Sequence, residues 1–316
     1  MPDVRAVVVD PSSPERLAIR PVPLNPAYRD EVTVRVRAIS LNRGEVNRAV
    51  RSAEPGWRPG WDFVGTVEEI APDGSGPLKG TRVVGMLPSG AWAEMIRVPH
   101  DAVAALPDEV TDAQAATLPV AGLTALYALR QGGLLLGRKV LIDGASGGVG
   151  HLACQLAVAS GAMVYGHVRN KDFAPMVEAW CGNRTIVGPE LGAAAPQGPY
   201  HLILDSVGGS ALGAALSMLS PAGTCVTFGV SEAPQATFDS GSFFRAGGTR
   251  LYGLILFSEL RRGEPAAEGL ATLAAMIARG ALKPRIEIEA GWAEIGSVAR
   301  RLLDRSFMGK AVLHVR

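Results

Sequence analysis

The sequence predicts an α/β protein built from a β-rich module and a doubly wound parallel sheet. Three observations carry this prediction. Residues 1 to about 115 are dense in short strand patterns and turn signals, and strands alternate with helical runs between residues 119 and 256. A glycine-rich run, residues 145–150, lies between an apolar strand and a helix. The alternation is typical of parallel strands joined by helical crossovers.

The β-rich module is predicted from alternation of apolar and polar residues. Residues 32–37 alternate strictly, which is typical of a half-buried strand. Further strands are predicted over residues 63–70, 82–86 and 93–98. Residues 73–77 form a Gly/Pro-rich turn cluster between them. A module with several short strands of this kind needs a sheet of its own.

The character of the chain changes at Thr111, where Thr111 and Gln114 have the spacing of a capping box that starts a helix. Later strands of the parallel sheet are predicted over residues 202–204, 224–228 and 251–256. Helices are predicted over 266–279 and 292–304, a surface loop over 193–199, and a final strand over 311–315. That last strand needs a sheet to join, and the N-terminal module is the expected one.

Composition excludes several classes of function. A length of 316 residues predicts two domains, and 47% apolar residues can fill two cores. A net charge of +1 gives no reason to expect a nucleic acid or an acidic membrane as partner. The start of the chain lacks the apolar segment of a signal peptide. The three cysteines, Cys154, Cys181 and Cys225, lie far apart, so we expect buried free thiols in a cytoplasmic protein.

The glycine-rich run has the context of a dinucleotide-binding loop. Residues 140–142 are an apolar strand, and a helical run starts at Val149 and ends before Gly161. A pyrophosphate binds backbone N–H groups at such a helix N-terminus, and the chain can approach it where no β-carbon intervenes. Ala145 stands where the fingerprint has its first glycine. The alternative is a tight strand–helix turn that binds nothing.

The segment after the second strand favours NADP(H) over NAD(H). NAD sites place an acidic residue about 20 residues after the first glycine, where it binds the ribose 2′-hydroxyl. Here no carboxylate occurs before Asp172, and Arg169 and Lys171 precede it. Two cations suit a 2′-phosphate. The alternative is that both belong to a solvated loop.

Together these motifs identify a family resemblance that covers nearly the whole chain. Its markers are the glycine loop and residues 40–45, 59–65, 90–94, 118–125, 205–209 and 309–312. In this order they resemble the medium-chain dehydrogenase/reductase superfamily, in its zinc-free quinone-oxidoreductase-like branch. The resemblance implies a GroES-like substrate domain over residues 1–118, completed by about 258–316. It also implies a Rossmann domain over residues 119–257.

The resemblance also implies site residues. The cofactor-binding residues expected from the motifs are Ala145, Ser146, Gly147, Gly148, Val149, Gly150, Arg169, Lys171, Asp205, Phe228, Gly229 and Lys310. The catalytic candidates are Asn42, Asn47 and Thr124, since relatives have these segments near the nicotinamide. For Asn42 the alternative is a residue that only caps a turn. Lys310 matches a family lysine near the cofactor, with a solvated lysine as the alternative.

No metal site is expected. Catalytic zinc needs three protein ligands such as Cys and His. The resemblance puts Asn42 at the position of the first zinc ligand and Trp61 at that of the second, and residues 113–125 contain no Cys or acid for the third. An amide and an indole cannot replace a thiolate and an imidazole. Without a metal, hydrogen-bond donors have to stabilise the developing negative charge.

We therefore expect an NADPH-dependent reductase of an enone or quinone. A carbonyl reductase or an enoyl-thioester reductase is the enzymatic alternative, with Arg43, Arg48, Arg51 and Arg58 as a cationic path for a thioester arm or as a solvated face. A non-catalytic NADPH-binding redox sensor is the alternative from another class.

The remaining residues have plainer expected roles. Arg43 and Glu45 are expected at the surface or as an ion pair, and the histidines as structural residues, with His167 a candidate near the adenosine phosphate. The tryptophans either line a cleft or pack in the core. An apolar edge strand over residues 251–256 predicts a homodimer, because such an edge has to be covered or paired.

Overall fold

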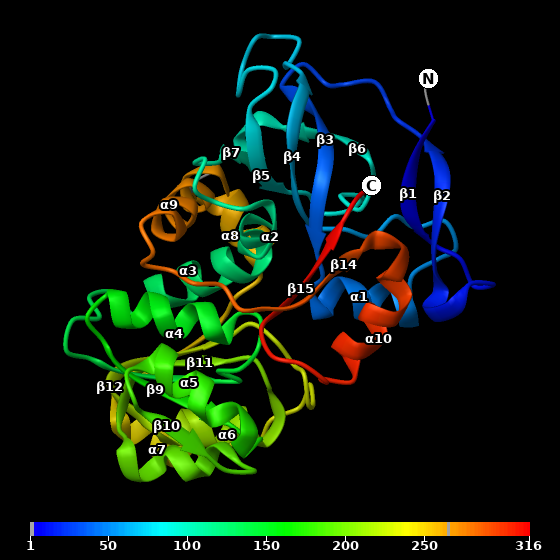
Figure 1. Ribbon diagram of the computed structural model, residues 1–316. Coiled ribbons are helices and arrows are strands. Elements are labelled where there is room, and N and C mark those ends of the chain that lie inside the picture. Colours follow the sequence, from blue (N-terminus) through cyan, green and yellow to red (C-terminus); the bar gives the residue numbers. More distant parts are fainter. Residues whose placement is uncertain (1–2, 264–265) are drawn as a thin grey trace. The chain divides into compact units, whose positions relative to one another are not determined.

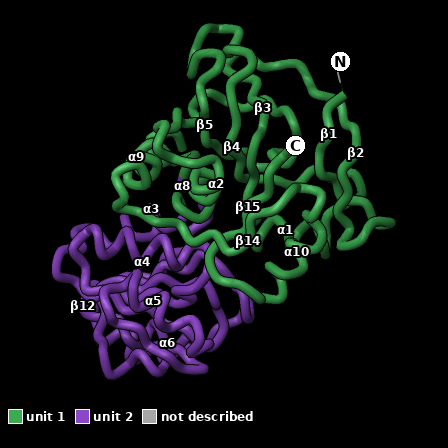
Figure 2. Tube along the Cα trace, viewed as in Figure 1, with its two compact units in different colours: residues 1–123, 260–316 green, residues 124–259 purple. Residues whose placement is uncertain are grey.

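The computed structural model describes residues 3–263 and 266–316. The chain forms two compact units, which Figure 2 colours separately. Unit 1 comprises Met1–Leu123 and Leu260–Arg316, and unit 2 comprises Thr124–Glu259. In the described ranges, no helix combines the length and the apolar character needed to cross a membrane.

Unit 1 is the β-rich unit. A two-stranded sheet pairs β1 (Asp3–Val9) with β2 (Leu17–Pro23) in antiparallel fashion, and a seven-stranded sheet has the order β14-β15-β3-β4-β5-β7, with β6 also paired to β3. The strands of the larger sheet are β3 (Glu31–Ser40), β4 (Asp62–Glu69), β5 (Arg82–Met86), β6 (Met95–Pro99), β7 (Val103–Ala105), β14 (Ile286–Gly291) and β15 (Lys310–His314). Fully buried Phe63 and Trp92 belong to its core.

The last strand joins the N-terminal sheet, as the sequence predicts. β15 runs antiparallel to β3, with Val312 opposite Ser40, and Figure 1 shows this red strand beside the blue β3. The described helical segments of unit 1 are η1 (Pro14–Arg16), α1 (Arg43–Arg51), η2 (His100–Ala102), α2 (Asp112–Ala116), η3 (Leu118–Gly122), α9 (Ala266–Ala278), η6 (Trp292–Glu294) and α10 (Ile295–Leu303). The capping box is confirmed, since Thr111 Oγ1 accepts from the Gln114 N–H at 3.1 Å.

Unit 2 is a parallel six-stranded sheet with the order β10-β9-β8-β11-β12-β13. This is the strand order of the Rossmann fold, whose ligands bind where the order reverses, here between β8 and β11. Its strands are β8 (Lys139–Asp143), β9 (Met163–Val168), β10 (Thr185–Val187), β11 (Tyr200–Asp205), β12 (Leu219–Thr227) and β13 (Arg250–Gly253). The predicted fold class is therefore confirmed.

The helical segments of unit 2 begin with α3 (Leu123–Arg130), whose first residue still belongs to unit 1. The others are α4 (Gly150–Ala159), η4 (Lys171–Phe173), α5 (Ala174–Cys181), η5 (Leu191–Gln197), α6 (Gly209–Ser217), α7 (Ser240–Ala246) and α8 (Leu256–Arg262), whose last three residues belong to unit 1. All three cysteines are buried free thiols, as expected.

Two local predictions are wrong. The strand predicted over residues 251–256 ends at Gly253, and α8 starts at Leu256, because a short apolar run does not separate strand from helix. The stretch predicted as a surface loop, residues 193–199, is mostly exposed, but it forms much of the 3₁₀ segment η5 and is not irregular. Leu191 and Ala194 are buried there, which gives this Ala-rich stretch an inner face.

Candidate active site

The glycine-rich run connects β8 to α4 by a tight turn. Gly144 has φ of +73°, and its carbonyl accepts from the Gly147 N–H at 2.9 Å. A β-carbon on Gly150 would lie 2.2 Å from the Gly144 oxygen, so only glycine allows this turn to close. Ala145 is fully buried, whereas Gly147 is exposed. The turn thus presents accessible backbone beside the N-terminus of α4, where the first N–H groups lack intrahelical partners.

Arg169 and Lys171 follow the end of β9 and are exposed. Nη1 of Arg169 lies 3.9 Å from a carboxylate oxygen of Glu232, and both side chains are about half exposed. An exposed pair at this distance contributes little stability. Asn170 between the two cations fixes the backbone, because its Oδ1 accepts from the Asp172 N–H at 2.9 Å.

Asp205 lies at the end of β11, next to β8 in the sheet, and its carboxylate is already committed. Oδ1 accepts from the N–H groups of Val207 and Gly208 at 3.0 Å each, and Oδ2 accepts from Thr227 Oγ1 at 2.8 Å. Burial raises the pKa of Asp205. Phe228, one residue beyond β12, donates its N–H to the Asp205 carbonyl at 3.0 Å. The Asp205 side chain therefore shapes the loop after β11, and its backbone carbonyl holds the start of the loop after β12.

Gly229 is confined by the same loops. A β-carbon there would lie 2.9 Å from the Ser206 oxygen. The unit thus brings Asp205, Phe228 and Gly229 together at the carboxyl ends of β11 and β12. The glycine loop follows β8, the strand on the other side of β11.

Unit 1 contains a buried polar cluster formed by Ser40, Asn42, Glu45, Asp62 and Lys310, which we call the Asn42 cluster. Asn42 is the residue that precedes α1, and its N–H donates to Glu45 Oε1 at 2.9 Å. Its side-chain Nδ2 donates to Glu45 Oε1 at 2.9 Å and to Asp62 Oδ2 at 2.7 Å. Both amide hydrogens are therefore used by carboxyl groups.

Lys310 completes the Asn42 cluster from the start of β15. Its Nζ donates to Asn42 Oδ1 at 2.6 Å and to the Leu41 carbonyl at 2.9 Å, and lies 3.5 Å from Asp62 Oδ2. Three acceptors require the three hydrogens of an ammonium group. Because its neighbours are an ammonium and two carboxyl groups, the orientation of the Asn42 amide is fixed. Burial lowers the pKa of Lys310.

Asp62 is the centre of this cluster, at the start of β4. Besides Asn42 and Lys310, its Oδ2 accepts from Ser40 Oγ at 2.6 Å, and its Oδ1 accepts from the Val120 N–H at 3.0 Å. Sequence reasoning missed Asp62 as a partner of Asn42, although it follows Trp61 in the stretch compared with zinc sites. Opposite positions on β3 and β4, Ser40 and Asp62, are paired by the sheet register.

The surroundings of Glu45 and Arg43 differ from the prediction of a surface position or a mutual ion pair. Neither an ion pair between them nor an exposed Glu45 is found: Glu45 is fully buried, and Arg43 Nη1 donates to the carbonyls of Leu302 and Leu303. Burial and the neighbouring Asp62 carboxylate hold the pKa of Glu45 well above its usual range. In the described part of the chain, Oε2 of Glu45 has no hydrogen-bond partner. The glutamate thus caps the start of α1 from inside the core.

The other catalytic candidates lie in different surroundings. Asn47 is exposed on α1 in unit 1, and Thr124 is 6% exposed in α3, at the first residue of unit 2. Trp61 Nε1 donates to the Pro88 carbonyl at 3.1 Å. In the ranges that the structure describes, no group of three or more His, Cys, Asp or Glu side chains has an arrangement that could hold a metal ion.

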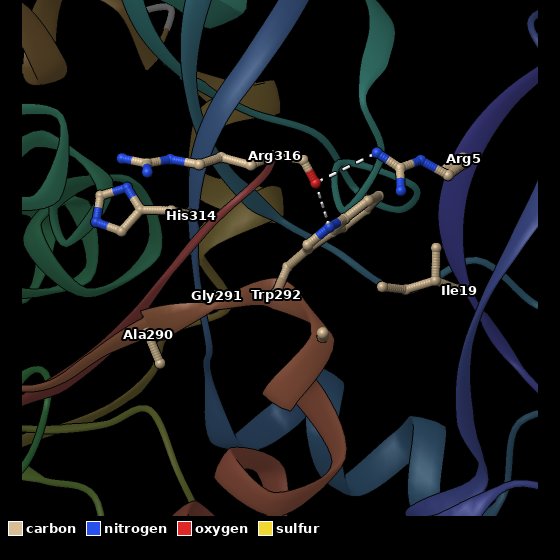
Figure 3. A pocket seen from close by; sticks show the side chains of 8 residues that line it. Arg5, Ile19, Ala290, Gly291, Trp292, His314 and Arg316 are labelled. Atoms are coloured by element: carbon tan, nitrogen blue, oxygen red, sulfur yellow. Dashed lines mark hydrogen bonds between the residues drawn. The ribbon is translucent and has the colours of Figure 1, made fainter.

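A cavity of about 400 Å³ lies elsewhere in unit 1 (Figure 3). Arg5, Trp292, His314 and Arg316 are among its lining residues. The Arg316 carbonyl accepts from Arg5 Nη2 and from Trp292 Nε1, at 3.2 Å each. None of the predicted site residues lines this cavity, so it adds nothing to the candidate site.

The parallel sheet, its glycine turn and the β-rich unit together define an α/β protein of two units, one of which has the Rossmann strand order. Two protein families match the chain: "Zinc-binding dehydrogenase" over residues 148–274 and "Alcohol dehydrogenase GroES-like domain" over residues 28–108. The chain belongs to the medium-chain dehydrogenase/reductase superfamily, in its quinone-oxidoreductase-like branch. The predicted family is thus confirmed.

Several known proteins are similar to this chain. The chain is 31% identical over 275 residues to the spectinabilin polyketide synthase system protein NorB of Streptomyces orinoci, covering 85% of this chain and 12% of NorB. The chain thus spans about a tenth of that relative. Among solved structures, the quinone oxidoreductase of Coxiella burnetii has a TM-score of 0.85 at 25% identity, with 100% of both chains covered. A mycobacterial protein complexed with NADPH has a TM-score of 0.86 at 24% identity, with 98% and 99% covered.

Proposed function

We propose that this chain is an NADPH-dependent reductase that transfers hydride to an activated C=C bond or a quinone without zinc. The observation that carries the proposal is the glycine turn after β8, followed one strand further by two exposed cations, Arg169 and Lys171, with no carboxylate before Asp172. The similar mycobacterial protein that binds NADPH supports the same cofactor.

The residues of unit 2 fit NADP(H). The helix N-terminus after Gly147 would hold the pyrophosphate, with Ala145, Ser146, Gly148, Val149 and Gly150 forming the turn around it. Arg169 and Lys171 would hold the 2′-phosphate. Asp205 would act indirectly, because its carboxylate holds the N–H of Gly208 and its backbone carbonyl holds the N–H of Phe228. Bound NADPH supplies the hydride for reduction of an electron-poor substrate.

Metal-free chemistry is supported by Asn42 and Trp61, the residues at the positions of the first two zinc ligands of zinc-dependent family members. Asn42 is an amide held by two carboxyl groups and an ammonium, and the Trp61 indole donates to a carbonyl. Negative charge that develops on the substrate oxygen then needs hydrogen-bond donors. Because both Nδ2 hydrogens of Asn42 are already used, we assign Asn42 to positioning its loop. Backbone N–H groups, Asn47 and Thr124 are the remaining candidates for the donor.

An enoyl-thioester reductase is the second candidate, favoured by the similarity to a polyketide synthase protein over 85% of this chain. Of the arginines considered for a thioester arm, Arg43 is engaged with the carbonyls of Leu302 and Leu303. Arg48 stacks on Trp57, with its guanidinium 4.5 Å from the ring centre, and it is exposed together with Arg51. These two are the arginines of α1 that an anionic arm would meet.

The β13 edge supports a homodimer. β13 is an edge strand of the parallel sheet, and its Leu251 is 46% exposed. Ile255 and Phe244 nearby in the chain are 66% and 83% exposed. Pairing this edge with a second copy would cover an aggregation-prone strand.

Leu251→Lys should then give a monomer by light scattering at micromolar concentration, whereas Val187→Lys on β10 should not. A wild-type monomer would contradict the proposal.

A substrate panel tests the function. The purified chain, kept in chelator, is mixed with NADPH and with quinones, enones, enoyl thioesters or ketones, and NADPH absorbance is followed. Consumption with quinones or enones supports the proposal, and consumption with enoyl thioesters alone supports the second candidate. Reduction of ketones alone would refute the reaction class. NADPH binding without any turnover would indicate a non-catalytic redox sensor.

A further inference from the structure

Asp143 and His167 form a buried polar pair at the carboxyl ends of β8 and β9. They are opposite each other in the register of the two strands, and their side chains are 4% and 3% exposed. Nδ1 of His167 lies 2.8 Å from Asp143 Oδ1. On the other side of the ring, Nε2 lies 3.1 Å from the Gly188 carbonyl, after β10. The ring therefore bridges three neighbouring strands.

The partners of this ring determine how many protons it carries. A carbonyl oxygen only accepts, so Nε2 of His167 carries a hydrogen. A neutral imidazole would then face Asp143 with a lone pair on Nδ1, and two acceptors would meet at 2.8 Å. A proton must lie between them. Imidazole is a far stronger base than carboxylate, so that proton belongs to the ring.

We infer that His167 is a buried imidazolium paired with the Asp143 carboxylate, and that this pair positions the glycine loop and the Arg169 segment for NADP(H). The positioning role rests on the proposed function. The protonation of the ring does not. In this arrangement Asp143 directly precedes the glycine turn, and His167 lies two residues before Arg169.

Backbone contacts couple the pair to both parts of the cofactor site. The Ala145 N–H in the glycine loop donates to the His167 carbonyl at 3.1 Å, and the Gly188 N–H donates to the Val168 carbonyl at 3.1 Å. Ser206 Oγ, from the loop after β11, donates to the Asp143 carbonyl at 3.3 Å. Loss of the Asp143–His167 contact would therefore shift the glycine loop and the segment that contains Arg169 and Lys171.

Neighbouring charges also favour the imidazolium form. Burial raises the pKa of Asp205 on β11 and of the Cys225 thiol on β12, and the charge of Asp143 raises both further. Oδ2 of Asp143 has no hydrogen-bond partner among the residues that the structure describes. A neutral His167 would leave the Asp143 charge uncompensated beside a second buried carboxylate, which is costly.

Nitrogen NMR of the apo protein tests the protonation directly. Histidine labelled with ¹⁵N is observed at about pH 8, where ordinary imidazoles are neutral. His201 in the same unit is the internal control, because its Nε2 lies 2.8 Å from a single carbonyl, that of Gly132. Both His167 nitrogens should have the shifts of protonated nitrogens, whereas His201 should have one. A His167 ring in which either nitrogen is unprotonated would overturn the inference.

NADPH binding to variants of the pair tests whether the pair positions the cofactor site, and NADPH and NADH binding to the wild type is the reference. His167→Gln and Asp143→Asn should each weaken NADPH binding by at least about tenfold, and the double variant should lose no more than either single one. His201→Gln should bind like the wild type. Additive losses, or equal losses for His201→Gln, would overturn the positioning role. If the wild type binds neither cofactor, the proposed function fails, while the NMR result still decides the protonation.

Discussion

Lys310 Nζ lies 2.6 Å from Oδ1 of Asn42, although 268 residues separate them in the chain. Both residues are buried, and the contact joins the start of β15 to the residue that precedes α1. With Asp62, it makes the Asn42 cluster a buried charge network inside the β-rich unit. Such networks are costly to break, because removing one member leaves another charge uncompensated.

Lys310→Met should therefore destabilise the protein strongly. The substitution leaves the Asp62 carboxylate buried without its cation, which typically costs about 3–5 kcal/mol in the free energy of unfolding. Lys79→Met, at an exposed lysine, is the matched control and should change this free energy by less than about 0.5 kcal/mol. Urea denaturation measures both. Equal midpoints for the two variants would mean that the cluster does not stabilise unit 1.

Glu45→Gln should change how stability depends on pH. The pKa of Glu45 is raised above 4.5 in the folded protein, so the folded state holds this proton more tightly than the unfolded state. The stabilisation that protonated Glu45 gives to the folded state is complete below about pH 4.5. As the pH rises toward the pKa of the folded state, this part of the unfolding free energy is lost, by at most about 1.4 kcal/mol per pH unit.

The glutamine variant lacks this titration. The unfolding free energy of the wild type minus that of the variant should fall as pH rises from 5 to 8, when both are measured in urea. A difference that stays constant or grows over this range would show that Glu45 is ionised in the folded protein.

Substitution of Asn42 should act through folding. Asn42→Ala removes the donors to Glu45 and Asp62 and the acceptor for Lys310, so it should lower the unfolding free energy by about 1–3 kcal/mol. Asn42→Asp should be worse, because it adds a third carboxyl group to the cluster. Turnover at a temperature where Asn42→Ala is fully folded separates the two roles. Near-normal turnover is expected, and a loss of a hundredfold or more would make Asn42 the donor to the oxyanion.

Arg169→Ala and Lys171→Ala should each weaken NADPH binding and leave NADH binding nearly unchanged. A charge-assisted hydrogen bond to the 2′-phosphate contributes about 1.5–3 kcal/mol, which corresponds to at least tenfold in Kd. Arg184→Ala, at another exposed arginine of unit 2, is the control. Wild-type NADPH should bind at least about tenfold more tightly than NADH for the same reason. Equal losses of NADPH and NADH affinity would mean that Arg169 and Lys171 support the fold and do not bind the 2′-phosphate.

The sequence predicts the architecture well because hydrophobic periodicity and glycine spacing are local signals. The glycine turn, the capping box at Thr111 and the terminal strand on β3 follow from such signals. The polar contacts do not. Glu45 looks like a surface residue in the sequence, because the burial of its partner Asn42 depends on Asp62 and Lys310, which are distant along the chain. The pairing of Asp143 with His167 depends on strand register, which the sequence does not specify.

The central claim is hydride transfer from NADPH to the β-carbon of an activated alkene. The most direct measurement uses NADPH that carries deuterium at the transferable position of its nicotinamide, the purified chain and an enone. Mass spectrometry and NMR then locate the label in the product. We expect one deuterium on the β-carbon of the saturated ketone. Deuterium on the carbonyl carbon, or a product without label, would contradict the account.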